Sequence, residues 1–184
     1  MARLKPISPD VASGKAKDLY TIIEGRLGVV PGMMQTMANS PAFLKGYLSL
    51  GDALAAGTIG SRVSELIALT IAETNGCDYC LAAHTYLGTN LVKIENHVME
   101  AARSAESADS KTDAILKFAK IVTEKKGQVS DADLAAARQA SVTDAEISEI
   151  IGHVALNVLT NYFNIVAKTE IDFPVVESGI AAVA

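Results

Sequence analysis

The chain contains two cysteines, Cys77 and Cys80, three residues apart. On a helical turn this spacing places their Cα atoms about 5 Å apart, within the roughly 4.4–6.8 Å that a disulfide bond requires. The unpaired N–H groups at the start of a helix also favour the thiolate form of a cysteine. The pair can therefore alternate between dithiol and disulfide, and its thiolate is the nucleophile that breaking a peroxide O–O bond requires.

Two further residues could move protons near these sulfur atoms. His84 follows Cys80 by four residues and Cys77 by seven, so the three share one face of a helix. Glu65 lies in the first turn of an apolar helix, where an unpaired carboxylate costs free energy. If the helices on either side of Gly76 fold back antiparallel, a rise of ~1.5 Å per residue leaves roughly 6 Å between the levels of Glu65 and His84. A long side chain or one bridging water can span that gap, so we expect a proton relay.

The same residue types permit other interpretations. Two thiolates, an imidazole and a carboxylate could complete a tetrahedral zinc shell, but the sequence has no second Cys-x-x-Cys and no histidine pair. Two cysteines in a helical protein can also be plain buried apolar groups. Attachment of c-type haem needs His directly after Cys80, where Leu81 stands. We therefore expect neither a metal nor a cofactor.

The segment from Glu65 to His84 resembles the signature of the alkylhydroperoxidase D-like proteins, within the carboxymuconolactone decarboxylase family. In that signature a glutamate is followed by eleven residues, Cys-x-x-Cys, three more residues and a histidine, as in this chain. The flanking residues resemble it too, and they are Ser64-Glu65, Asn75-Gly76-Cys77 and Ala82-Ala83-His84. The helical pattern from about 40 to 170 is compatible with the same family.

The resemblance implies an all-α, oligomeric peroxidase that reduces hydrogen or alkyl hydroperoxides. It makes Cys80 the attacking cysteine, Cys77 the resolving cysteine, and Glu65 with His84 the proton relay. A dithiol of another protein, lipoyl-type or thioredoxin-like, would restore the reduced state. Helix-end electrostatics alone favour attack by Cys77 instead, which leaves the order of the two cysteines open. The chain departs from many peroxidases of the family at Tyr79, where they have histidine, and this bears on the efficiency of turnover.

Two other functions fit the same sequence. A redox-sensing or adaptor protein of this fold would be oxidised once and turn over poorly. A decarboxylase acting on a lactone acid would match the family's namesake, but that chemistry has no use for Cys-x-x-Cys.

Helical periodicity dominates the rest of the chain, so we expect an all-α, compact multi-helix bundle. Expected helices open at Ser8-Pro9-Asp10, at Ser40-Pro41 and at Ser61, and others cover about 77–88, 91–103, 111–126, 130–140 and 143–168. Thr143 with Glu146 fits a capping box, and Ser130 with Asp133 a looser one. The tail after Asp172-Phe173-Pro174 cannot continue the last helix and is expected to cross a surface.

We treat the chain as a single domain, 1–184, with its core at about 40–170 and the redox motif at 65–84. A faint internal repeat relates 63–67 to 147–151 and suggests a degenerate duplication. In that register Cys77 and Cys80 fall opposite Asn161 and Asn164. The polar stripe His153, Asn157 and Asn161 is expected to be hydrogen-bonded inside the core or an interface. Three tyrosines are expected to pack rather than contact substrate: Tyr47, Tyr79 and Tyr86.

Charge and hydropathy narrow the partners and the location. The net charge is −5 and no cluster of Lys or Arg occurs, which argues against nucleic-acid binding. No stretch reaches the roughly 18 apolar residues of a membrane span, so we expect a cytoplasmic protein. An Ala-rich chain whose last helix carries few charges indicates a buried face in a homo-oligomer, a dimer, trimer or hexamer.

Overall fold

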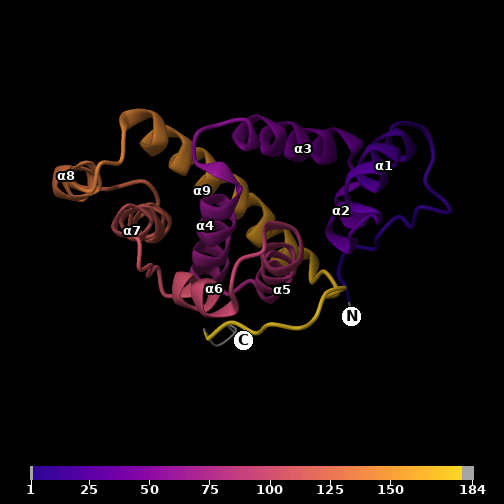
Figure 1. Ribbon diagram of the computed structural model, residues 1–184. Coiled ribbons are helices and arrows are strands. Elements are labelled where there is room, and N and C mark those ends of the chain that lie inside the picture. Colours follow the sequence, from indigo (N-terminus) through magenta and orange to yellow (C-terminus); the bar gives the residue numbers. More distant parts are fainter. Residues whose placement is uncertain (1, 180–184) are drawn as a thin grey trace.

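The computed structural model describes residues 2–179, and within that range it is all-helical, as the periodicity predicts. Figure 1 shows the arrangement. The helices are α1 (Gly14–Leu27), α2 (Gly32–Met37), α3 (Pro41–Ala55), α4 (Gly60–Asn75), α5 (Asp78–Leu87), the π-helical segment η1 (Gly88–Val92), α6 (Asn96–Arg103), α7 (Ser110–Glu124), α8 (Asp131–Gln139) and α9 (Asp144–Ala167).

Helix α4 is the centre of the fold. It contacts α5, α6, α7 and α9, and every residue from Leu66 to Ala72 is buried. An apolar surface all round a helix is what such a central position requires. Helix α3 runs along the top of α9, whereas α1 and α2 pack at the far end of α3 (Figure 1).

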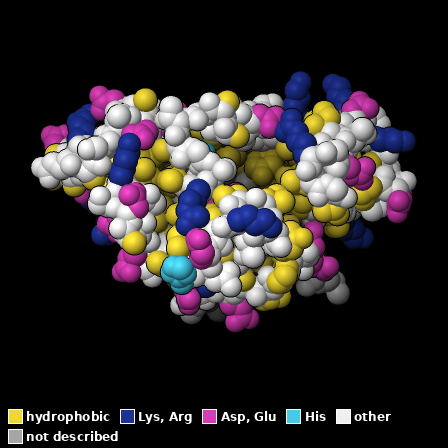
Figure 2. All heavy atoms as spheres, viewed as in Figure 1, with side chains coloured by type: hydrophobic (Ala, Val, Ile, Leu, Met, Phe, Trp, Pro, Cys, Tyr) yellow, Lys and Arg dark blue, Asp and Glu magenta, His cyan; other side chains and the backbone are white. Residues whose placement is uncertain are grey.

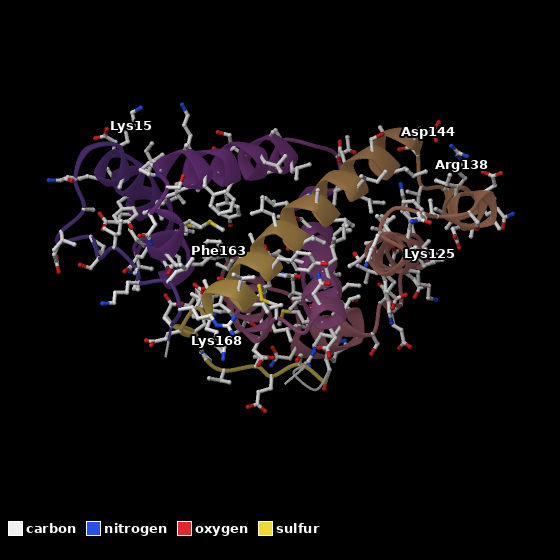
Figure 3. The ribbon with its side chains drawn as sticks, turned by 180° about the vertical axis from the view of Figure 1, so that it is seen from behind. Lys15, Lys125, Arg138, Asp144, Phe163 and Lys168 are labelled. Atoms are coloured by element: carbon white, nitrogen blue, oxygen red, sulfur yellow. A yellow bond between two sulfur atoms is a disulfide. The ribbon has the colours of Figure 1, made fainter. Side chains whose placement is uncertain are left out.

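The helix starts predicted from capping residues are capped in the structure as expected. Ser40 accepts a hydrogen bond from the N–H of Phe43 and so caps α3. Both capping boxes form, one at Ser130 before α8 and one at Thr143 before α9. Between these two helices Arg138 donates to Asp144, and Figure 3 shows the two side chains at the turn, with Lys168 at the opposite end of α9.

Three helix boundaries differ from those predicted. The first helix begins at Gly14 instead of Ser8, because residues 8–12 form a single turn and Gly14 then has a positive φ of 53°. A short helix that was not predicted, α2, begins directly after Pro31. The predicted helix at 91–103 begins at Asn96, because Lys93 takes the left-handed conformation at the end of η1. A proline or a local left-handed residue decides each of these boundaries.

One described helix, α9, is long and apolar enough to cross a membrane by length and composition alone. This is weak evidence, because core helices of water-soluble proteins satisfy the same test. Within its most apolar window 44% of the residues are buried inside the fold. Buried polar side chains also follow α9, from His153 to Asn164, and they contact other helices of the protein.

The segment after α9 runs back beneath α5 and α6 (Figure 1). The Asp172 carboxylate accepts a hydrogen bond from the N–H of Gly32 at 2.6 Å. Further along, the N–H of Ser178 donates to Asp78 and that of Gly179 to Glu73. These bonds fix the tail to α2, α5 and α4, so it crosses a surface as predicted.

Candidate redox site

The two cysteines lie where α4 turns into α5. Gly76 ends α4 with a left-handed φ of 67°, which a residue without Cβ adopts readily. Cys77 is the N-cap of α5, and its Sγ accepts a hydrogen bond from the N–H of Cys80 at 3.3 Å. A disulfide joins Cys77 and Cys80, whose Cα atoms are 5.3 Å apart. The predicted proximity of the two sulfur atoms is confirmed.

Glu65 and His84 form a direct pair beside the cysteines. The Oε2 of Glu65 lies 2.8 Å from the Nδ1 of His84, with the two side chains 18% and 24% exposed. Because α4 begins at Gly60, Glu65 lies in its second turn instead of the first. Its long side chain closes the gap that the helical rise leaves, and no bridging water is needed. An ionised carboxylate only accepts, so Nδ1 donates and the other ring nitrogen is left for proton exchange.

A pocket of about 180 Å³ opens at this site. Cys80 and His84 line it, whereas Cys77 does not, although both sulfur-bearing residues are at most 3% exposed. In Figure 2 hydrophobic side chains line a hollow below α3. The other lining residues are mostly apolar or aromatic and are Arg26, Leu27, Val29, Pro31, Met33, Met34, Tyr47, Tyr79, Ala83, Tyr86, Leu87, Leu91, Thr160, Asn164 and Phe173.

Aromatic side chains form much of the pocket wall. Tyr79 stacks edge-on against Phe173 of the tail, with ring centroids 5.8 Å apart, and Tyr86 contacts the same ring at 5.5 Å. The hydroxyl of Tyr79 accepts from the N–H of Met33, and burial raises the pKa of Tyr79. Burial, with the nearby Glu65 carboxylate, raises the pKa of Tyr47 to about 12. These tyrosines make packing contacts, but all three also line the cavity, so the expectation that they do not contact a substrate stays a prediction.

The sequence reasoning missed Asn164 as a residue of the site. Its Nδ2 donates to the Sγ of Cys80 at 3.4 Å and to the Sδ of Met33 at 3.2 Å. The available signal was the internal repeat, whose register sets Asn164 opposite Cys80. Met33 was not predicted as a site residue either, because it belongs to α2, a helix that was not predicted.

The polar stripe on α9 lies outside the pocket lining. His153 is buried, and its Nδ1 lies 3.4 Å from the Oγ of Ser64. Burial lowers the pKa of His153, although the carboxylates of Glu149 and Glu65 act in the opposite direction. Asn157 bonds the helix backbone, and Asn161 accepts from Asn75. The stripe is therefore a hydrogen-bonded part of the core, as predicted.

No group of three or more His, Cys, Asp or Glu side chains converges as a metal site among residues 2–179. The two sulfur atoms bond each other, and the carboxylate bonds the imidazole. The four side chains that a zinc ion would need as ligands are therefore bonded to one another in two pairs.

Comparison with known proteins gives a family and a fold. Residues 41–124 match the carboxymuconolactone decarboxylase family. An alkylhydroperoxidase core, an uncharacterized peroxidase-related protein from Ralstonia eutropha JMP134, is 21% identical with a TM-score of 0.82, and the match covers 93% of this chain and 92% of that chain. A peroxidase-related protein from Silicibacter sp. TM1040 is 21% identical with a TM-score of 0.78, covering 92% and 94%.

A third structure is similar to the same extent. The debrominase Bmp8, solved in complex with 2,3,4-tribromopyrrole, is 18% identical with a TM-score of 0.78, over 94% of this chain and 92% of that chain. No curated protein matches the sequence.

The fold and the redox hairpin together define the class of protein. Residues 41–124 match the carboxymuconolactone decarboxylase family, and the fold of the described chain is similar to that of the alkylhydroperoxidase core structure. The family match over residues 41–124 agrees with the resemblance found from the spacing of Glu65, Cys77, Cys80 and His84, all four of which lie within the matched segment.

Proposed function

We propose that the protein is a thiol-dependent peroxidase that reduces hydrogen or alkyl hydroperoxides through the Cys77–Cys80 pair. One observation carries the proposal. Cys80 lines an apolar pocket while Cys77 lies behind it, bonded to Cys80 and away from the lining. This difference supports attack by Cys80 and resolution by Cys77. The position of His84 in the same lining, with Glu65 on its Nδ1, supplies the proton relay.

The reaction balances with these groups alone and an external dithiol. The Cys80 thiolate attacks the terminal oxygen of the hydroperoxide, an S–O bond forms and the O–O bond breaks, and His84 gives a proton to the leaving alkoxide. Cys80 is now a sulfenic acid. The Cys77 thiol attacks this sulfur, the disulfide forms and water leaves. A dithiol of another protein then reduces the disulfide and is itself oxidised. The disulfide in the structure corresponds to the state before that last step.

A turnover assay tests the proposal. Purified protein supplied with tert-butyl hydroperoxide and a dithiol should consume peroxide continuously, and Cys80→Ser should abolish consumption. Cys77→Ser is the matched variant, because it keeps the attacking thiolate: it should consume about one equivalent and stop as the sulfenic acid. Unchanged turnover in Cys80→Ser would overturn the mechanism.

The burial of both cysteines favours one second candidate, a redox-sensing or adaptor protein of the same fold. Such a protein would be oxidised stoichiometrically and would show no sustained turnover with any reductant. A decarboxylase of lactone acids, the third candidate, would release carbon dioxide unaffected by substitution of either cysteine. The peroxidase proposal includes a cytoplasmic location, a lipoyl-type or thioredoxin-like reductant and a homo-oligomer.

A further inference from the structure

Asn164 differs from the other buried polar residues of α9. Asn157 and Thr160 bond the backbone of their own helix, whereas the amide of Asn164 bonds two sulfur atoms from other helices. Asn164 is 3% exposed and lines the pocket together with Cys80. It follows the labelled Phe163 in Figure 3, near the end of α9.

Only one of the two polar atoms of the Asn164 amide has hydrogen-bond partners among the described residues. Its Nδ2 donates to the Sγ of Cys80 and the Sδ of Met33, and sulfur in a disulfide or thioether can only accept. Its Oδ1 is buried and has no hydrogen-bond partner among the described residues. A buried amide oxygen left without a donor is unfavourable, so a donor that enters the pocket gains a bond there.

We propose that Asn164 is a catalytic residue of the peroxidase site, its Nδ2 stabilising the Cys80 thiolate and its Oδ1 accepting the O–H of the bound hydroperoxide. The inference rests on the proposed function. A hydrogen bond to an ionised acceptor is stronger than one to a neutral acceptor, so the Nδ2 bond strengthens when Cys80 becomes a thiolate. An alkyl hydroperoxide has one O–H donor, on the terminal oxygen that the thiolate attacks, and hydrogen peroxide has the same donor on the oxygen under attack. One amide therefore holds both reacting atoms.

Other titratable groups face the same pocket. They are Arg26 from α1, Tyr47 from α3, and Tyr79, His84 and Tyr86 from α5, with Glu65 of α4 behind His84. Asp172 of the tail lies near Tyr79. Asn164→Ala leaves all of these groups in place and adds no charge, so a change in the thiolate's pH profile in that variant is attributable to the lost amide.

The first test measures thiolate formation without peroxide. In a Cys77→Ser background, the rate of Cys80 alkylation by iodoacetamide is followed against pH. Asn164→Ala should move the midpoint of that profile upward by about one pH unit, since a hydrogen bond to a charged group changes the equilibrium roughly tenfold. Asn164→Asp keeps the shape but brings a carboxylate, and it should move the midpoint further upward. Asn157→Ala, a buried amide on the same helix outside the pocket, is the control and should leave the midpoint in place.

The second test adds the peroxide. At pH values above both midpoints all of the Cys80 is thiolate, and the single-turnover rate of sulfenic acid formation by tert-butyl hydroperoxide in Asn164→Ala should still be about tenfold below that of the unsubstituted chain. Thermal unfolding and circular dichroism of each variant report whether it folds, and Asn164→Leu, which keeps the bulk of the side chain but has neither donor nor acceptor, gives the readout if Asn164→Ala does not fold.

The outcomes separate this inference from the proposed function. An unmoved midpoint in both Asn164 variants, or a rate that recovers fully at high pH, would overturn the role of Asn164. A shifted midpoint in a protein that consumes no peroxide would support the thiolate contact and contradict the peroxidase itself.

Discussion

Two glutamates with the same local sequence take different roles in this protein. Glu65 and Glu149 each follow a serine near the start of a long apolar helix. Glu65 holds the imidazole of His84, whereas Glu149 reaches from α9 and accepts the N–H groups of Thr58 and Ile59 just before α4. The first carboxylate lies behind a pocket-lining imidazole, and the second accepts the free N–H groups at a helix start. At the scale of single residues, the partner that a side chain meets decides its role.

Replacement of Glu65 by glutamine tests the relay at this scale. The amide can still bond His84, but it cannot stabilise the imidazolium that forms when the ring holds a proton. We expect the rate of peroxide reduction by the reduced protein to fall about 10–100-fold, the range for loss of acid–base assistance. Stopped-flow single turnover measures it. Glu73→Gln on the same helix removes a carboxylate paired with Arg103, outside the pocket lining, and an equal loss there would count against the relay.

At the scale of helices, Glu149 connects α9 to the start of α4. Its Oε2 accepts the N–H of Thr58 at 2.7 Å, the Thr58 hydroxyl at 3.0 Å and the N–H of Ile59 at 3.0 Å. Glu149→Ala leaves these donors to water and removes the contact between the two helices. We expect a loss of about 1–2 kcal/mol in the free energy of unfolding, measured by denaturant titration. Glu100→Ala, at an exposed position of α6, should change it by less than about 0.5 kcal/mol.

Most of the helices could be predicted because each begins and ends with local chemistry. Ser130 and Thr143 bond their own next turn, and Gly76 supplies the left-handed stop, so the sequence alone reveals them. The spacing of Glu65, Cys77, Cys80 and His84 predicted the redox centre for the same reason. The pocket could not be predicted in this way. Its walls meet by long-range packing, such as Met33 against Asn164 and Tyr79 against Phe173, and neither period nor motif encodes those contacts.

Across the whole molecule, stability should depend on pH through His153. Burial lowers the pKa of this histidine from 6.5 in the folded state, so the unfolded chain binds its proton first as the pH falls. The free energy of unfolding should therefore have its full value above pH 6.5 and should decrease as the pH falls below 6.5. His153→Gln should weaken that decrease, as denaturant titrations above and below this pH would show. His97→Gln is the matched control at an exposed position, and identical slopes in all three proteins would contradict the prediction.

The outer face of α9 supports the expected homo-oligomer. Tyr162, Ile165 and Val166 lie close together there and are 54%, 43% and 61% exposed. Grouped exposed apolar side chains of this kind mark contact surfaces between subunits. We expect sedimentation equilibrium to give a mass that is a multiple of 19.3 kDa, and Val166→Glu to shift it toward the monomer. Val11→Glu, at a position in the N-terminal segment that is 71% exposed, should leave the mass unchanged. A monomer in the unsubstituted protein would refute the prediction.

The tail that crosses beneath α5 contributes to the cavity wall from outside residues 41–124. Phe173 closes one side of the cavity, and Met33, Thr160 and Asn164 also lie outside the segment shared with the family, residues 41–124. The cysteine pair, Glu65 and His84 all lie inside that segment. Substitutions in the tail would therefore reshape one side of the cavity without touching the four residues that carry the chemistry.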